Sequence, residues 1–462
     1  MKKVISRADL LKIKYGNISY EKDFKDRQGV AHDGVQYAAD VYEVDATQLD
    51  CYVRYPYDTT KQLSSGRPWL YIVIDVYSTM VVGMYIGFDG PNVNGAQQAL
   101  ANACLDKVEF AARYGLAITP NCIPAKHPPR RVAIDNGKEY PNGFISGILN
   151  SSLGIEMFDI LPAYRGDGKG TNEGFFNVIN KKVIHFLKGA IHKNMGREQQ
   201  HPSNYTLYDY DALVALVLNQ IIVLNTTSER MNKLNFQMVR DNVEPTPQAI
   251  FLNSLEYDRD GGRPTTKDDE AEVRWAFLPE EEATIRPDGI YFKGLKYQSV
   301  YAQENGWHAT ANAHDSFKVP VKRIRDWANT LWHKTPTGEY IEFTLANTNN
   351  ESPYQDGHWE CIEQLQSDLR ARRHKLKQDS RFIRALADTR FRYIHETNVE
   401  EVDLSPDNET KSIQRGIKER FERNKRIVAA DEALELSELF MQQNKQAIAD
   451  QSYIAGADDD IY

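Results

Sequence analysis

The order of the apolar runs constrains the fold of this chain more than any other feature. Three runs with β character come first, a helical segment follows, and short strands then alternate with helices. The strand-type runs cover 42–55, 69–78, 80–88, 130–135 and 155–163. Helical spacing is found in 94–115, 144–154, 171–193 and 210–227. This order predicts an α/β domain with a mixed sheet and helices on its faces.

The pattern of the sequence changes after about residue 240. Short strands with Pro-Glu-Glu and Pro-Asp-Gly turns predict a small β-barrel, and the chain then becomes helical with a break near 398–412. The domains we expect are an N-terminal extended arm (1–36), an α/β domain (37–235), a β-barrel domain (236–350), a helical region for DNA or protein contacts (351–446) and a flexible acidic tail (447–462).

Composition narrows the class of protein. The 462 residues leave room for about three domains, and no apolar run approaches the ~20 residues of a membrane span. Four cysteines lie far apart without a CxxC pair, which is typical of reduced, cytoplasmic packing residues. The net charge of −9 argues against a polyanionic partner, but the span 370–392 carries nine Lys/Arg and two Asp. That stripe is equally compatible with a solvated helix face.

Three carboxylates stand at positions that favour function, although each has a structural alternative. Asp45 shares a strand face with apolar residues and is expected to point inward, unless a bulge near Thr47 breaks the alternation. Asp135 ends a buried strand before Asn-Gly, where it could instead be a turn residue. Glu173 opens a helix with an apolar stripe, and a helix-stabilising role there is common.

Taken together, these carboxylates form a plausible metal-binding set. Three hard oxygen donors suit Mg²⁺ or Mn²⁺ and leave positions for water and phosphate. Two such ions can activate a nucleophile and stabilise a leaving oxygen in phosphoryl transfer. A fourth acid, Asp75, lies between two strands and fits a structural hairpin turn better.

The motifs around the three acids resemble those of the DDE transposase and retroviral integrase superfamily, and most of all TnsB-type and Mu transposases. The motifs are YEVDAT, AIDNGKEY and AYRGDGKGTNEGFFNVIN, and DGIYFKGLKY resembles the barrel that follows the catalytic domain in that family. The resemblance implies an RNase H-like, mixed five-stranded sheet, with Asp45, Asp135 and Glu173 as catalytic ligands of two Mg²⁺ (or Mn²⁺) ions. It implies 3′-end cleavage and strand transfer of transposon ends into target DNA.

The resemblance also implies partners. We expect transposon-end and target DNA, a homo-oligomer on DNA, a TnsC-like AAA+ ATPase regulator bound by the C-terminal tail, and a TnsA-like endonuclease, in the bacterial cytoplasm and nucleoid. Candidate phosphate contacts are Arg165, Lys169, Lys181, Lys182, Arg372, Arg373 and Lys375.

Two departures from the family pattern and two rival functions remain. Asn172 and Gly174 flank Glu173 where relatives often carry other residues, and the N-terminal helix-turn-helix domains of the family are absent. Either the chain is a fragment or end recognition resides elsewhere.

The first rival function is a stand-alone RNase H-like nuclease, but the barrel and the helical region argue against it. The second is a catalytically idle DNA-binding scaffold, and the intact Asp-Asp-Glu set argues against that.

Overall fold

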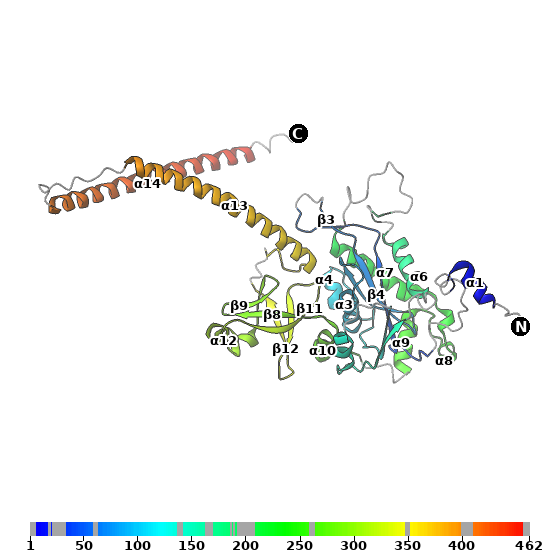
Figure 1. The fold of residues 1–462 in the computed structure, drawn as a ribbon. Helices are drawn as coiled ribbons and strands as arrows, with labels where there is room; N and C mark the ends of the chain where they lie inside the picture. Colours follow the sequence, from blue (N-terminus) through cyan, green and yellow to red (C-terminus); the bar gives the residue numbers. More distant parts are fainter. Residues whose placement is uncertain are drawn as a thin grey trace. The chain divides into compact units, whose positions relative to one another are not determined.

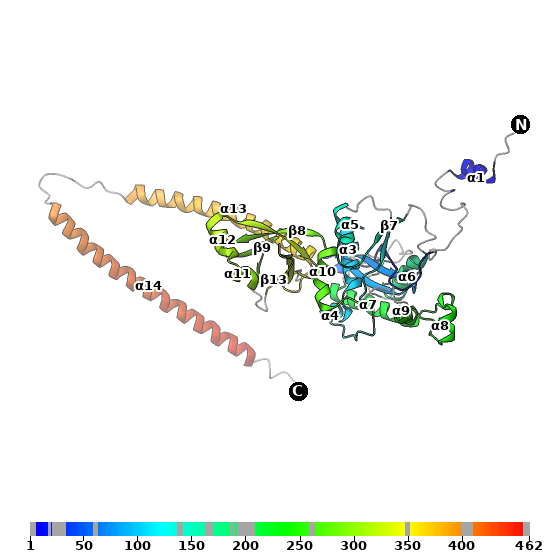
Figure 2. The same cartoon turned by 90° about the horizontal axis from the view of Figure 1, so that it is seen from below.

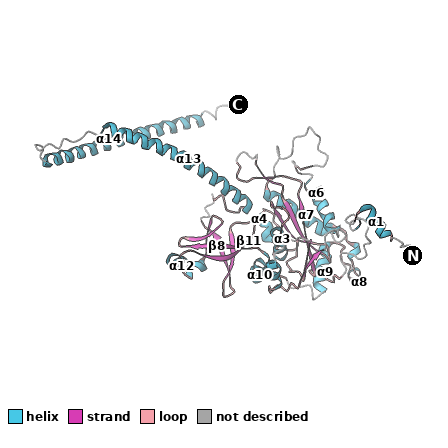
Figure 3. Ribbon diagram, in the orientation of Figure 1, coloured by secondary structure: helices cyan, strands magenta, loops and turns pink. Residues whose placement is uncertain are grey.

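The structure is a computed structural model and describes most, but not all, of the chain. The described residues are 6–16, 20, 34–58, 63–135, 142–161, 170–184, 187, 190–191, 208–257, 264–346, 352–398 and 410–455. The chain divides into two compact units, Met1–Arg373 and His374–Tyr462. The described strands of the first unit form a five-stranded sheet, a closed barrel and a two-stranded sheet, and the second unit is helical where it is described (Figure 3).

The first group of strands is a five-stranded mixed sheet (Figure 1). Its spatial order is β5 (Val81–Gly87), β4 (Trp69–Asp75), β1 (Val41–Gln48), β6 (Arg131–Asp135) and β7 (Met157–Leu161). The strands β5, β4 and β1 are antiparallel, whereas β1, β6 and β7 run parallel. This confirms the mixed sheet expected from the order of apolar runs. The predicted long first strand is split, because β1 ends at Gln48 and a two-residue β2 (Val53–Arg54) pairs with β3 (Ser64–Gly66).

Helices pack around this sheet. They are α3 (Val93–Cys104), α4 (Lys107–Arg113), α5 (Asn142–Leu149), α6 (Gly170–Lys182) and α7 (Tyr210–Thr227). The helix expected over 171–193 ends at Lys182. The helix α7 has the length and composition of a membrane span, but Leu213, Val217 and Ile221 are buried in the sheet's core. Such burial is the ordinary position of an apolar helix in a globular core.

The single helix predicted over 94–115 is two helices, and Lys107 explains the break. Asp106 caps α4 by accepting the N–H of Val108 at 2.7 Å. The buried ammonium of Lys107 donates to the carbonyls of Ala103, Leu105 and Ala125 at 3.0, 2.7 and 2.8 Å. Two of these carbonyls end α3, so the lysine satisfies groups that a continuing helix would have paired. Burial lowers the pKa of Lys107 to about 7.

The second group of strands is a closed barrel with the order β10-β13-β12-β11-β8-β9. Its strands are β8 (Glu280–Arg286), β9 (Gly289–Phe292), β10 (Leu295–Gln298), β11 (Phe317–Arg323), β12 (Thr330–Lys334) and β13 (Tyr340–Leu345). The helices α11 (Val300–Glu304) and α12 (Trp307–His314) lie beside it (Figure 2). A barrel was predicted, but its strands begin only at Glu280. The segment before it forms α8 (Phe236–Arg240), α9 (Pro247–Tyr257) and α10 (Lys267–Phe277).

Arg325 ties the barrel to the sheet within the first unit. Its guanidinium contacts Asp89, after β5, at 2.7 Å and Glu360 at 3.0 Å. Glu360 lies in the first turn of α13 (Trp359–Asn398). The side chain of Arg325 is only 11 % exposed, and ion pairs this enclosed hold their partners in fixed geometry. The start of α13 is therefore fixed to both the sheet and the barrel.

Both ends of the chain differ from the expected arm and tail. The segment Arg7–Tyr15 forms the helix α1, capped by Ser6, which accepts the N–H of Asp9 at 3.1 Å. The helix α14 (Thr410–Ala455) continues well into the expected tail, so only 456–462 lie beyond it, outside the described residues. The Ser-x-x-Asp cap is a sequence signal for the start of α1. The helix was not expected because its apolar residues show no clear helical period.

Candidate metal centre and nucleic-acid contacts

The register of β1 and β6 brings two of the three candidate ligands together. The last paired residues of these parallel strands are Val44 and Ile134. Asp45 and Asp135 are the next residue on each strand. Neighbouring strands lie about 4.8 Å apart, so the two backbones stand side by side at the carboxyl end of β6. This edge is where α/β sheets commonly place ligands.

Asp45 is firmly placed because β1 is a central strand. On its other side β1 pairs with β4, and Asp45 lies opposite Ile72. Its Oδ1 accepts the N–H of Ala46 at 2.9 Å, and the side chain is half-buried. A half-buried carboxylate at the centre of a sheet retains access to solvent cations. Ala46, Thr47 and Gln48, on both faces of the strand, are equally half-buried, so this burial does not distinguish the predicted inward orientation from an outward one.

Glu173 is the fourth residue of α6, as expected for the first turn of that helix. The apolar stripe that follows it is buried at Phe176, Ile179 and Val183 and joins the same core as the sheet. Leu187 and Ala190 are also buried but, like Val183, lie past the helix. The side chains of Asp135 and Glu173 are outside what the structure describes. Among the described side chains, no group of three His, Cys, Asp or Glu could hold a metal ion. The donor set itself, three carboxylates, suits a hard divalent cation.

Asp75 has the structural role that the hairpin pattern predicted. It ends β4, is fully buried and accepts the N–H of Ala39 and the N–H of Ser78, both at 2.8 Å. The Ser78 hydroxyl donates to it as well. Burial raises the pKa of Asp75 to about 6, against the lowering effect of these donors. A carboxylate so fully engaged with the protein has little capacity left for a metal.

The candidate phosphate contacts lie on two helices. Lys181 and Lys182 are exposed in the last turn of α6, and Arg372, Arg373 and Lys375 are exposed on α13. Arg165 and Lys169 lie outside the described residues.

Helical geometry sorts the basic residues of α13 into a seam that the sequence analysis did not separate. Each residue turns 100° about the helix axis, so positions three or four apart share a face. Those positions carry Arg370, Arg373, Lys377, Arg381, Arg384 and Arg392, which we call the basic seam, with Asp388 as its one interruption. Arg372 and Lys375 point to other sides of the helix. A line of exposed apolar residues, including Leu376 and Ile383 at 66 % and 64 % exposure, runs next to the seam.

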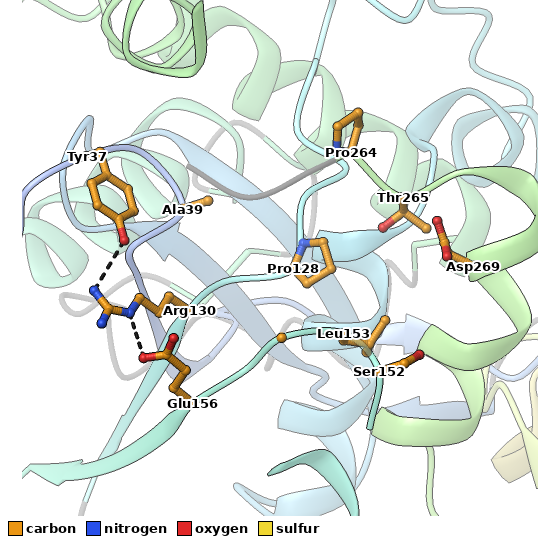
Figure 4. A pocket seen from close by; sticks show the side chains of 11 residues that line it. Tyr37, Ala39, Pro128, Arg130, Ser152, Leu153, Glu156, Pro264, Thr265 and Asp269 are labelled. Atoms are coloured by element: carbon orange, nitrogen blue, oxygen red, sulfur yellow. Dashed lines mark hydrogen bonds and ion pairs between the residues drawn. The ribbon is translucent and has the colours of Figure 1, made fainter. Parts of the chain in front are cut away.

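One cavity of the first unit, drawn in Figure 4, has none of the candidate ligands among its described lining residues. It measures about 510 Å³ and is lined by residues that precede β1, β6 and β7, at the end of β6 opposite Asp135. Among the described residues that line this cavity, Arg130 is the one cation. Its guanidinium donates to Glu156 at 2.7 Å and to the hydroxyl of Tyr37 at 3.3 Å. Because its charge is already paired, this cavity has no evident part in phosphoryl chemistry.

Comparison with known proteins finds similarity to DNA transposases. Residues 43–189, which span β1 to just past α6, match the TnsB C-terminal domain family. The Tn7 transposition protein TnsB of Escherichia coli is 29 % identical over 307 residues, which cover 65 % of this chain and 42 % of TnsB. The transposase for transposon Tn552 of Staphylococcus aureus is 26 % identical over 155 residues, or 34 % of this chain and 28 % of that protein.

The chain is similar to the TnsB-type transposases, the resemblance that its motifs indicated. It spans less than half the length of the curated relatives that it matches. The matched family region contains Asp45, Asp135 and Glu173.

Proposed function

We propose that this protein is a DDE transposase that cuts the 3′ ends of a transposon and transfers them into target DNA. Phosphodiester hydrolysis first frees a 3′-hydroxyl. That hydroxyl then attacks a target phosphodiester, so that one bond forms as one breaks and neither a covalent enzyme intermediate nor ATP is needed. The observation that carries the proposal is the register that sets Asp45 beside Asp135 inside the region matching the TnsB C-terminal domain family.

The sheet supports an RNase H-like assignment for the domain. Its order, β5-β4-β1-β6-β7, has three antiparallel strands joined through β1 to two parallel ones. In this arrangement Asp45, Asp135 and Glu173 would hold two Mg²⁺ or Mn²⁺ ions. When bound, such ions activate the attacking hydroxyl and stabilise the leaving oxygen. The protein's own part is to position the three carboxylates on a rigid sheet and helix and to align the DNA by phosphate contacts.

Phosphate contacts on α6 and α13 would position the DNA. Lys181 and Lys182 end the helix that carries Glu173, and the basic seam offers six cations on one face of α13. Of the three candidate phosphate contacts that the sequence indicated on α13, Arg372, Arg373 and Lys375, only Arg373 belongs to the basic seam. The six cations outnumber Asp388, so the seam retains a strong positive charge although the whole chain is acidic.

The proposed partners follow from the TnsB-type resemblance. They are transposon-end and target DNA, further copies of this chain on that DNA, an AAA+ ATPase regulator and an endonuclease that cuts the other strand. A protein that acts on bacterial DNA in this way would work at the nucleoid.

One experiment separates the proposal from its rivals. The purified chain is incubated with labelled, pre-cut end DNA, a plasmid and Mg²⁺, and the products are resolved on a gel. Joined end–plasmid products are expected from the unmodified chain and not from Asp45→Asn. Cut DNA without joining would indicate a stand-alone nuclease, and DNA binding without any product would indicate a scaffold.

A further inference from the structure

A second cavity, of about 460 Å³, lies between the β4–β5 hairpin, α6 and the segment after α7. We call it the α6–α7 pocket. Its apolar wall includes Phe175, Val178 and Leu224, and its polar wall includes Arg230 and Lys233. It therefore combines an apolar surface with two cations in one enclosure.

Neither cation forms an ion pair with a carboxylate among the described residues, although the buried Asp75 acts on Lys233 through space. Arg230 donates from Nε to the Thr79 hydroxyl at 2.7 Å and from Nη1 to the carbonyl of Glu229 at 2.8 Å. Lys233 donates to the carbonyl of Val76 at 3.1 Å. These contacts leave N–H groups of both side chains available, since a guanidinium has five and an ammonium has three.

The charged groups at the pocket are two cations, Arg230 and Lys233, and two carboxylates, Asp75 and Glu229. Burial lowers the pKa of Arg230. Burial, together with the neighbouring charge of Arg230, lowers the pKa of Lys233 to about 8. Asp75 acts in the opposite direction, but its carboxylate is sealed in the hairpin turn by Ala39 and Ser78. Glu229 lines the pocket from an exposed position. An anion between the two cations would relieve the cost of burying them together.

The pocket adjoins the proposed active site. Ile74, in its wall, lies two residues along β4 from Ile72, which is the cross-strand partner of Asp45. Two strand residues span about 7 Å, and residues two apart share a face of the sheet. Phe175 lies on α6, the helix that also carries Glu173, but the two residues are about 200° apart around the helix axis. A DNA strand bound at Asp45 would thus pass within about 7 Å, along the sheet, of the pocket wall at Ile74.

We propose that the α6–α7 pocket binds an unpaired nucleotide of the DNA strand, with its phosphate between Arg230 and Lys233 and its base against the wall formed by Phe175, Val178 and Leu224. The choice of DNA as the occupant rests on the proposed function. A base pair cannot enter a cavity of this size, whereas a single flipped or terminal nucleotide can. A phosphate ion alone would leave the apolar wall uncovered.

The test compares two DNA probes by fluorescence anisotropy without Mg²⁺, so that it does not depend on catalysis. One probe is a blunt duplex, and the other is the same duplex with a three-nucleotide single-stranded overhang. Lys233→Met and Arg230→Gln are each expected to weaken binding of the overhang probe about tenfold and to leave the blunt duplex unchanged. Arg240→Gln is the matched control, because Arg240 is an exposed cation on α8 that does not line the pocket.

Two further variants keep the test decisive if loss of the Val76 contact unfolds the protein. Lys233→Arg retains the charge and should restore preference for the overhang. Val178→Phe fills the pocket without changing any charge and should remove that preference. Equal losses on both probes, or no loss on either, would overturn the proposal. Displacement of the overhang by an acidic peptide but not by thymidine 5′-phosphate would overturn it in favour of a peptide site. Failure of strand joining with intact overhang preference would count against the proposed function alone.

Discussion

Ser78 donates from its hydroxyl to Oδ2 of Asp75 at 2.5 Å, inside the turn that joins β4 to β5. The register of β1 and β4 puts Asp75 opposite Tyr42 and Asp45 opposite Ile72. Two aspartates three residues apart along the sheet thus have different surroundings. One is sealed in a turn and the other is half-buried beside Asp135.

The first prediction separates these two aspartates by their activity. Asp45→Asn should abolish strand joining while DNA binding stays within twofold, as should alanine or amide variants of Asp135 and Glu173. Asp75→Asn should retain joining, because its carboxylate holds a turn. The measurement is the yield of joined product per bound protein. An active Asp45→Asn together with an inactive, folded Asp75→Asn would show that the first ligand is wrongly assigned.

The second prediction concerns stability and pH at Asp75. Its pKa of about 6 in the folded chain exceeds the ordinary value of 3.8, so the folded state binds this proton more tightly. The resulting stabilisation is complete below pH 3.8 and is lost as the pH rises through 6, by up to about 3 kcal/mol. The measured quantity is the free energy of unfolding of the unmodified chain minus that of Asp75→Asn. This difference should decrease as the pH is raised from 4 to 6. A difference that rises over this range would contradict the assignment.

The third prediction concerns Lys107. Lys107→Met keeps the length of the side chain but leaves the carbonyls of Ala103, Leu105 and Ala125 without their donor, at a cost of about 2 kcal/mol or more. Chemical denaturation monitored by circular dichroism measures this loss. Lys126→Met, at the more exposed neighbour of Ala125, is the control and should change stability by less than about 0.5 kcal/mol. A stable Lys107→Met variant would mean that water replaces the ammonium.

The fourth prediction concerns the basic seam. Replacing Arg373, Lys377 and Arg381 by alanine should weaken binding to all DNA sequences alike and reduce the salt slope of log K by about 2.7. The matched control removes Arg372, Lys375 and Arg390, three exposed cations of the same helix outside the seam. Equal effects of the two triple variants would show that α13 contributes only its total charge.

The fifth prediction concerns the end of the chain. Deleting 451–462 should spare the joining of pre-cut ends by the protein alone but remove stimulation by the AAA+ regulator. The apolar residues Tyr453, Ile454, Ile461 and Tyr462 in an acidic segment are typical of a docking peptide. A truncated chain that still responds normally to the regulator would rule out this role.

The parts of the fold that could be predicted are those encoded in apolar periodicity. Ile72, Val73 and Ile74 in β4 read as a buried strand and are one, and Phe176 and Ile179 mark the buried side of α6. The order of such runs was enough for the mixed sheet, the barrel and the C-terminal helices.

The errors arose where a single polar group decides the structure. The segment 94–115 has uninterrupted helical spacing, and its break depends on Asp106 as a cap and on Lys107 reaching the carbonyl of Ala125, which is distant in sequence. Nothing in local spacing shows such a contact. The basic seam, by contrast, was present in the sequence, and counting its charges at a period of 3.6 would have separated Arg373 from Arg372 and Lys375.

The continuous helix α13 fixes a length as well as a charge. Arg370 and Arg392 are separated by 22 residues within it, a rise of about 33 Å. One full turn of B-form DNA is about 34 Å, or ten base pairs. A helix that follows the axis of a duplex meets the same strand again after one such turn. If the seam binds DNA as proposed, the length of helix between its first and last cation corresponds to a single helical repeat of the duplex.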